Sequence, residues 1–130
     1  MKIAVIGAGQ MGNGIAQVAA SAGYEVLMVD IKQEYVEKGI NTIKKSLGKL
    51  VAKERISQSD ADSAIARIKL STERNDCHDV DLVVEAVPEI LELKIEIFAE
   101  LDKICKADCI LASNTSSISI STIAEVTSRP

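Results

Sequence analysis

The sequence predicts an α/β fold in which an open, doubly wound parallel sheet carries helices on both faces. Three observations favour this architecture. Short apolar runs rich in β-branched residues alternate along the chain with longer helix-like stretches. These runs lack strict apolar–polar alternation, as expected of strands that are buried on both faces. The first run is followed by a glycine-rich turn that leads directly into a helix pattern.

The predicted elements follow one another with short connections. Strands are expected over residues 2–6, 25–30, 68–71, 81–87 and 109–112. Helices are expected over residues 11–21, over a two-helix hairpin between 33 and about 67, and from Pro88 to about residue 106. The hairpin breaks near residues 55–60, where serine and aspartate offer an N-cap, and Thr122 with Glu125 predicts a capping box for a last short helix.

Apolar residues three and four apart would place one face of the helix after Pro88 against the sheet. They are Ile90, Leu93, Ile97, Leu101 and Ile104. The fold class is therefore a Rossmann-type sheet with a helical hairpin inserted after the second strand.

Composition bounds what the chain can bind. Its 130 residues, 47% of them apolar, predict one compact domain. The net charge of −4 gives no overall attraction to nucleic acid or to an anionic membrane surface. The sequence shows neither an apolar run near the roughly 18 residues of a spanning helix nor a secretory signal, so a soluble cytoplasmic protein is expected. Cys77, Cys105 and Cys109 are expected to be reduced and buried, without a disulfide or a metal site.

The segment GAGQMG at residues 7–12 has the spacing G-x-G-x-x-G. Gly7 would permit the tight turn, Gly9 would let backbone N–H groups approach a pyrophosphate, and Gly12 would let the helix pack close to the strand. Asp30 ends the second strand, 18 residues beyond Gly12. Its carboxylate can accept hydrogen bonds from both hydroxyls of an adenosine ribose and repel a 2′-phosphate. These features predict an NAD site, and a glycine turn that binds nothing is the alternative.

The hairpin segment is basic within an acidic chain. Between residues 33 and 55, six basic side chains stand against three acidic ones. Ser46, Lys49 and Lys53 are three and four apart, so they share a helical face that could hold a phosphorylated adenine nucleotide. A solvated helix face is the commoner explanation of such a run, and charge alone leaves both interpretations open.

Polar residues 114–117 follow the fifth predicted strand. They would lie at the carboxyl edge of the sheet, where open α/β sheets bind their ligands. Ordinary turn chemistry explains any one of these residues. Four of them together make a ligand site and an ordinary turn about equally good explanations.

Three segments of the chain resemble a known family. They are GAGQMGNGIAQVAA at residues 7–20, VVEAVPEILELKIEIFAELDKIC at 83–105 and ILASNTSSISISTIAEVTSRP at 110–130. Together they resemble the N-terminal domain of the 3-hydroxyacyl-CoA dehydrogenases, particularly the bacterial 3-hydroxybutyryl-CoA dehydrogenases. The likeness runs over essentially the whole chain, and the ASNTSS segment separates this family from other dehydrogenases of the same fold.

The resemblance implies which residues hold the cofactor. The pyrophosphate would contact five residues of the turn: Gly7, Gly9, Gln10, Met11 and Gly12. Asp30 would bind the adenosine ribose. The nicotinamide half and its surroundings would involve Glu89, Lys94 and Asn114.

The resemblance also implies an acyl-CoA substrate. Ser46 and Lys53 match positions that contact coenzyme A, and Ser116 matches a catalytic serine that hydrogen-bonds the reacting oxygen. The implied reaction is reversible hydride transfer between C3 of a 3-hydroxyacyl-CoA and the nicotinamide, with 3-hydroxybutyryl-CoA and acetoacetyl-CoA as the expected pair.

The family's catalytic histidine, in a G-x-H-F-F-N-P segment, and the glutamate that orients it would lie beyond residue 130. His78 is not expected to replace that histidine, because it precedes the fourth strand. A helical C-terminal domain that forms a homodimer would also lie beyond this chain, so these 130 residues are expected to bind NAD without turnover. The alternatives are a free-standing NAD-sensing domain and a structural fragment without function.

Overall fold

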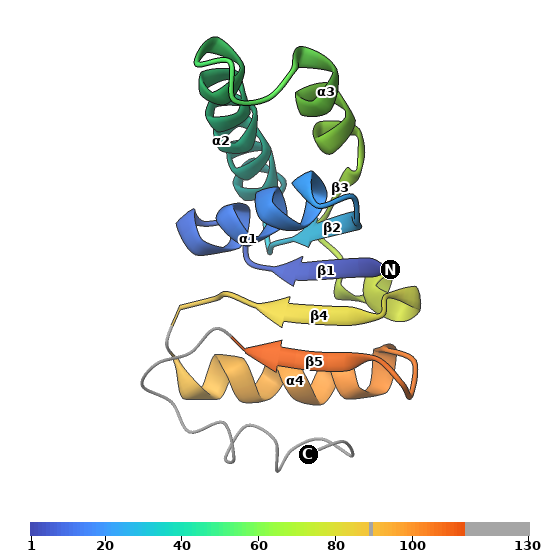
Figure 1. Cartoon of the computed structure of the whole chain (residues 1–130). Coiled ribbons are helices and arrows are strands. Elements are labelled where there is room, and N and C mark those ends of the chain that lie inside the picture. Colours follow the sequence, from blue (N-terminus) through green and yellow to red (C-terminus); the bar gives the residue numbers. More distant parts are fainter. Residues whose placement is uncertain (89, 114–130) are drawn as a thin grey trace.

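The computed structural model describes residues 1–88 and 90–113 as alternating strands and helices (Figure 1). The strands are β1 (Lys2–Ile6), β2 (Glu25–Val29), β3 (Ile68–Ser71), β4 (Leu82–Glu85) and β5 (Ile110–Ser113). The helices are α1 (Gln10–Ser21), α2 (Gln33–Ala52), α3 (Gln58–Ala66), the 3-10 helix η1 (Arg74–Asp79) and α4 (Leu91–Ile104). Every predicted strand is present, with ends that differ by at most two residues.

The described strands form one parallel sheet in the order β3-β2-β1-β4-β5. β1 lies at the centre, where Ile3 pairs with Val26 of β2 on one side and with Leu82 of β4 on the other. The direction of growth reverses at β1, because the chain builds outward to β3 before it returns to β4. The predicted doubly wound α/β fold is confirmed, and its switch point lies beside β1.

Side chains of the sheet pack into separate cores on its two faces. Ile3 and Val5 join a core that includes residues of α1, α2 and α3. Ala4 and Ile6 point the other way, into a core formed with η1 and α4. Because both faces are covered, the strands read as continuous apolar runs in the sequence.

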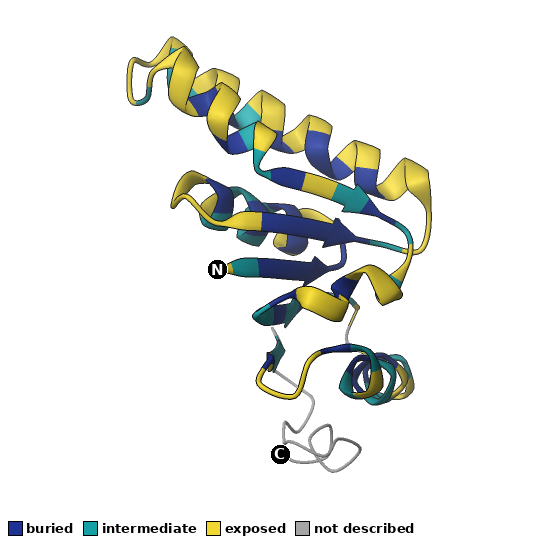
Figure 2. Cartoon of the chain, turned by 90° about the vertical axis from the view of Figure 1, so that its right-hand side faces the viewer, coloured by how far each residue is buried: buried dark blue, intermediate teal, exposed yellow. Residues whose placement is uncertain are grey.

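The hairpin of α2 and α3 covers one face of the sheet near β3 (Figure 1). Figure 2 shows α2 exposed along its outer face and buried along its inner face. The buried residues recur at helical spacing: Val36, Gly39, Ile40, Ile43 and Leu47. Ser57 caps α3, since its Oγ accepts a hydrogen bond from the N–H of Asp60 at 3.0 Å. The hairpin and its cap are confirmed.

The predicted start of the fourth helix at Pro88 is wrong. α4 begins at Leu91, because Ile90 adopts an extended conformation with φ −118° and ψ 111°. Ile90 is therefore outside the apolar face assigned to it and is 50% exposed, whereas Ile97 and Leu101 lie in the core as expected. The last short helix predicted from residue 122 lies outside the described residues.

The helix η1 was not predicted. Its sequence RNDCHD has a single apolar residue, Cys77, and no helical periodicity. Burial, followed by the nearby Asp76 carboxylate, raises the pKa of the Cys77 thiol to about 12. All three cysteines are buried thiols rather than disulfides, as predicted.

Within residues 1–88 and 90–113, no helix is long and apolar enough to cross a membrane. The same residues contain no group of three His, Cys, Asp or Glu side chains that could hold a metal ion.

Candidate functional site

A cleft of about 1040 Å³ opens at the carboxyl ends of the central strands. Its walls come from the turn after β1, from the loops after β2, β3 and β4, and from α2 and α4. It therefore lies at the switch point, where open parallel sheets bind ligands. The structure brings together Gly7, Gly9, Gln10, Met11 and Asp30, which all line this cleft.

The turn after β1 depends on two glycines. Gly7 has φ +111°, and a Cβ there would lie 2.6 Å from the carbonyl oxygen of Ala86. A Cβ on Gly12 would lie only 1.8 Å from the carbonyl oxygen of Gly7. The tight turn and the close approach of the helix, which the sequence predicted, are therefore steric requirements of this fold.

Helix α1 begins at Gln10, and no side chain of the described residues caps it. The first N–H groups of a helix have no partners within the helix. At the cleft they can donate to an anion, which the helix dipole also favours. A Cβ on Gly9 would meet no described atom within 4 Å, so the fold itself does not require a glycine there. The role of Gly9 toward a pyrophosphate stays a prediction.

The Asp30 carboxylate is held in place by backbone donors. Its Oδ2 accepts from the N–H of Ala8 at 2.8 Å, and its Oδ1 accepts from the N–H of Ile31 at 2.7 Å. The first bond ties the end of β2 to the glycine turn, which also donates from the Gly7 N–H to the Val29 carbonyl at 2.7 Å. The carboxylate is therefore fixed at the cleft wall before any ligand arrives.

A buried ion pair lies beside the cleft, at the carboxyl ends of β4 and β5. The side chains of Glu85 and Lys94 are both 0% exposed, and Lys94 Nζ lies 2.9 Å and 3.1 Å from the two oxygens of Glu85. Glu85 also accepts from Ser113 Oγ at 2.5 Å and from the N–H of Val87 at 2.7 Å. Because a buried charge is tolerated only when it is paired and hydrogen-bonded, this network explains both burials. It joins β4, β5 and α4 into one wall of the site.

Sequence reasoning assigned Lys94 to the site but missed Glu85 and Ser113. A signal was present, because an acidic residue in an apolar strand also marked Asp30. It was overlooked because the fourth strand was expected to run to residue 87. In the structure, the N–H of Val87 bonds to the Glu85 side chain, and β4 ends at Glu85.

Of the two predicted coenzyme A residues, Ser46 lies on α2 and Lys53 is the C-cap that follows it, and neither lines the cleft. Ser46 is half-buried, and its Oγ accepts from Nε2 of Gln17 on α1 at 3.0 Å. Lys53 is exposed at the C-terminal end of α2. Gln17 was not predicted, and its contact with Ser46 bridges the two helices.

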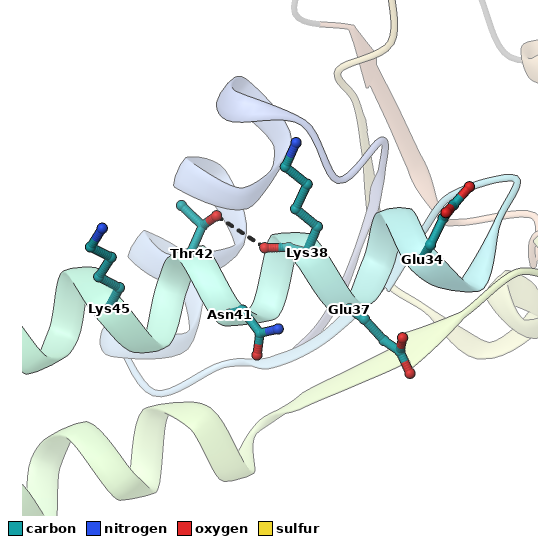
Figure 3. A pocket seen from close by; sticks show the side chains of 6 residues that line it. All are labelled: Glu34, Glu37, Lys38, Asn41, Thr42 and Lys45. Carbon is teal, nitrogen blue, oxygen red and sulfur yellow. Dashed lines mark hydrogen bonds between the residues drawn. The ribbon is translucent and has the colours of Figure 1, made fainter.

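A shallower hollow lies along α2, lined by side chains between Glu34 and Lys45. Figure 3 shows Lys38, Thr42 and Lys45 in a row along the helix, with Thr42 Oγ1 donating to the Lys38 carbonyl at 3.0 Å. Lys38 and Thr42 line both hollows, so the two adjoin.

Three predicted site residues, Glu89, Asn114 and Ser116, lie outside the described residues. His78 lies in η1, before β4, and its Nδ1 is 3.0 Å from the Asn75 carbonyl. It therefore sits at the opposite end of β4 from the cleft, as expected.

Comparison with known proteins identifies the family of the chain. The family model for the 3-hydroxyacyl-CoA dehydrogenase NAD-binding domain matches residues 2–130. The chain belongs to this family. It is 48% identical over 130 residues to a Deinococcus radiodurans protein named "Probable 3-hydroxybutyryl-CoA dehydrogenase", covering 100% of this chain and 46% of that protein. The crystal structure of (S)-3-hydroxybutyryl-CoA dehydrogenase from Ralstonia eutropha superposes with a TM-score of 0.96 at 48% identity, covering 98% of this chain and 45% of that one.

Other members of the family extend the match. A 3-hydroxybutyryl-CoA dehydrogenase of Bradyrhizobium diazoefficiens is 43% identical over 129 residues, which cover 99% of this chain and 44% of that protein. The chain thus spans about half the length of these relatives. NAD is the cofactor of this domain, and the uncapped start of α1, the fixed Asp30 carboxylate and the adjoining cleft fit a dinucleotide.

Proposed function

We propose that this chain supplies the cofactor half of an NAD-dependent oxidoreductase that interconverts 3-hydroxyacyl-CoA and 3-oxoacyl-CoA. The proposal depends on the cleft of this chain, which belongs to the family. Asp30 is held at one wall of the cleft, and the Glu85–Lys94 network lies at another. The relatives named 3-hydroxybutyryl-CoA dehydrogenases make 3-hydroxybutyryl-CoA and acetoacetyl-CoA the proposed substrate pair. Bound NAD supplies the hydride chemistry.

The residues of the turn divide the work of holding the cofactor. Gln10, Met11 and Gly12 offer backbone N–H groups at the start of α1 to the pyrophosphate. Asp30 accepts from the hydroxyls of the adenosine ribose and repels a 2′-phosphate, which selects NAD over NADP. Glu89, Lys94 and Asn114 surround the nicotinamide half.

The substrate is proposed to use a second surface. Ser46 of α2 and Lys53, the C-cap of that helix, bind coenzyme A. The Ser46 hydroxyl accepts from Gln17 and so has its proton available to a phosphate oxygen. Ser116 hydrogen-bonds the reacting oxygen and holds it for proton transfer. The same proposal includes the catalytic histidine of the family as the base and a helical domain that forms a homodimer. It also includes a cytoplasmic location.

A chimera tests this function. Residues 2–130 of the chain would replace the matching part of the Ralstonia eutropha enzyme, to which it superposes with a TM-score of 0.96. The chimera is expected to oxidise NADH in the presence of acetoacetyl-CoA. A folded chimera that binds NADH yet oxidises none with acetoacetyl-CoA or a longer 3-oxoacyl-CoA would contradict the proposal and favour the NAD-sensing alternative.

Variants of the chimera separate the coenzyme A surface from a merely solvated face. Ser46→Ala and Lys53→Glu should each raise KM for acetoacetyl-CoA about threefold to tenfold, the effect of one lost hydrogen bond or ion pair at a partly exposed site. KM for NADH should stay unchanged. Lys44→Ala is the matched control, because Lys44 is exposed on the same helix about half a turn away from Ser46.

A further inference from the structure

One end of the cleft is bounded by an ion pair to which the family resemblance assigns no role. Arg74 of η1 donates from Nη1 to Oε2 of Glu100 on α4 at 2.6 Å. A second carboxylate of α4, Glu96, lies 3.8 Å from the same nitrogen. The Arg74 side chain is 17% exposed and that of Glu100 is 43% exposed, and both residues line the cleft. Glu100 is therefore held in place but can still be reached from the cleft.

The position of Asp30 indicates which part of a dinucleotide meets this pair. With the pyrophosphate at the start of α1 and the adenosine ribose at Asp30, the adenine base continues beyond the ribose. On the α2 side, the lining offers the polar side chains Lys38 and Thr42, together with Tyr35, whose ring centre already lies 5.6 Å from Lys32 Nζ. On the α4 side, Val87 of the loop after β4 and Ile97 of α4 are apolar. A flat heterocycle is bound mainly by apolar surfaces with a few placed polar groups, so the α4 side suits the base.

We infer that Glu100, held by Arg74, is a residue that determines specificity for the adenine base. This inference rests on the binding of NAD in the cleft. A carboxylate only accepts hydrogen bonds, and Arg74 already uses Oε2. Oε1 can accept from the exocyclic amino group of adenine. Hypoxanthine carries a carbonyl oxygen at that position, so the carboxylate would face another acceptor.

The experiment compares two reduced dinucleotides that differ in the group on carbon 6 of the purine and in the proton that hypoxanthine carries on the adjacent N1. NADH and reduced nicotinamide hypoxanthine dinucleotide are titrated into the chain, and the nicotinamide fluorescence gives both dissociation constants. The chain should prefer NADH about fivefold or more, the discrimination expected of one charge-assisted hydrogen bond at a partly exposed site. Glu100→Gln should lose most of this preference, because an amide can turn to donate to the hypoxanthine oxygen.

Glu96→Gln is the matched control, since Glu96 lies on the same helix beside the same arginine but does not line the cleft. It should keep the preference of the unmodified chain. Equal affinities of the unmodified chain for the two dinucleotides would overturn the inference while leaving NAD binding intact. The same holds if Glu100→Gln keeps the preference. Failure to bind either dinucleotide would contradict the NAD site itself, and the inference with it.

Discussion

Replacing Lys94 with methionine would leave the Glu85 carboxylate buried without its cation, since both side chains are 0% exposed. Removal of one member of a buried pair typically costs about 3–5 kcal/mol. A lone buried carboxylate can instead take up a proton. This protonation costs about 1.36 kcal/mol for each pH unit above ~4.3, the pKa of a free glutamate. That route limits the loss to about 3.7 kcal/mol at pH 7 and to about 1 kcal/mol at pH 5. The destabilisation by Lys94→Met should therefore shrink as the pH falls.

Urea unfolding followed by circular dichroism measures this effect at both pH values. Lys103→Met is the matched control, because Lys103 is exposed on the same helix, and its effect should stay within about 0.5 kcal/mol. The double variant Glu85→Gln with Lys94→Met should recover most of the lost stability at pH 7, since no buried charge remains. An equal loss for Lys94→Met at the two pH values, or a loss no larger than that of the control, would refute the reasoning.

Two further predictions concern the turn and the opposite edge of the sheet. Gly12→Ala should weaken NADH binding by about tenfold or more, because its Cβ would lie 1.8 Å from the Gly7 carbonyl oxygen. Gly14→Ala is the control and should bind NADH normally, since a Cβ there meets no described atom within 4 Å. The hydrogen bond from the Lys106 ammonium holds the pKa of Asp81 below its ordinary 3.8. The charged form of Asp81 therefore stabilises the fold above that pH, so Asp81→Asn should be less stable than the parent near neutral pH. The difference between their urea midpoints should close below pH 3.8. A difference that persists in acid would contradict this.

Much of the fold could be predicted because its signals are local in the sequence. The apolar runs, the glycine turn and Ser57 at the start of α3 each act over a few residues, and the structure has them where the sequence indicated. The start of α4 was misplaced because Pro88 commonly occupies the first turn of a helix, whereas here Ile90 is extended and the helix begins only at Leu91. Helix η1 was missed because it has no periodicity to detect.

The position of a residue at the cleft was predictable where it follows from its own strand or turn, as for Asp30. Glu85 and Glu100 were missed because each is positioned by partners that only the fold brings close. Arg74 and Glu100 are 26 positions apart, and Ser113 lies 28 positions beyond Glu85. Charge and burial of a single residue give no indication of such contacts.

Titration of the chain with NADH and NADPH tests the assignment of the cleft most directly. Asp30 is fixed by the N–H groups of Ala8 and Ile31, and it should favour a ribose diol and repel a phosphate. The chain is expected to bind NADH more tightly than NADPH, and Asp30→Ala should weaken NADH binding by about 1.5–3 kcal/mol for each charged hydrogen bond lost. Equal affinity for the two dinucleotides, or an Asp30→Ala variant that binds NADH as well as the parent chain, would contradict NAD binding at this carboxylate.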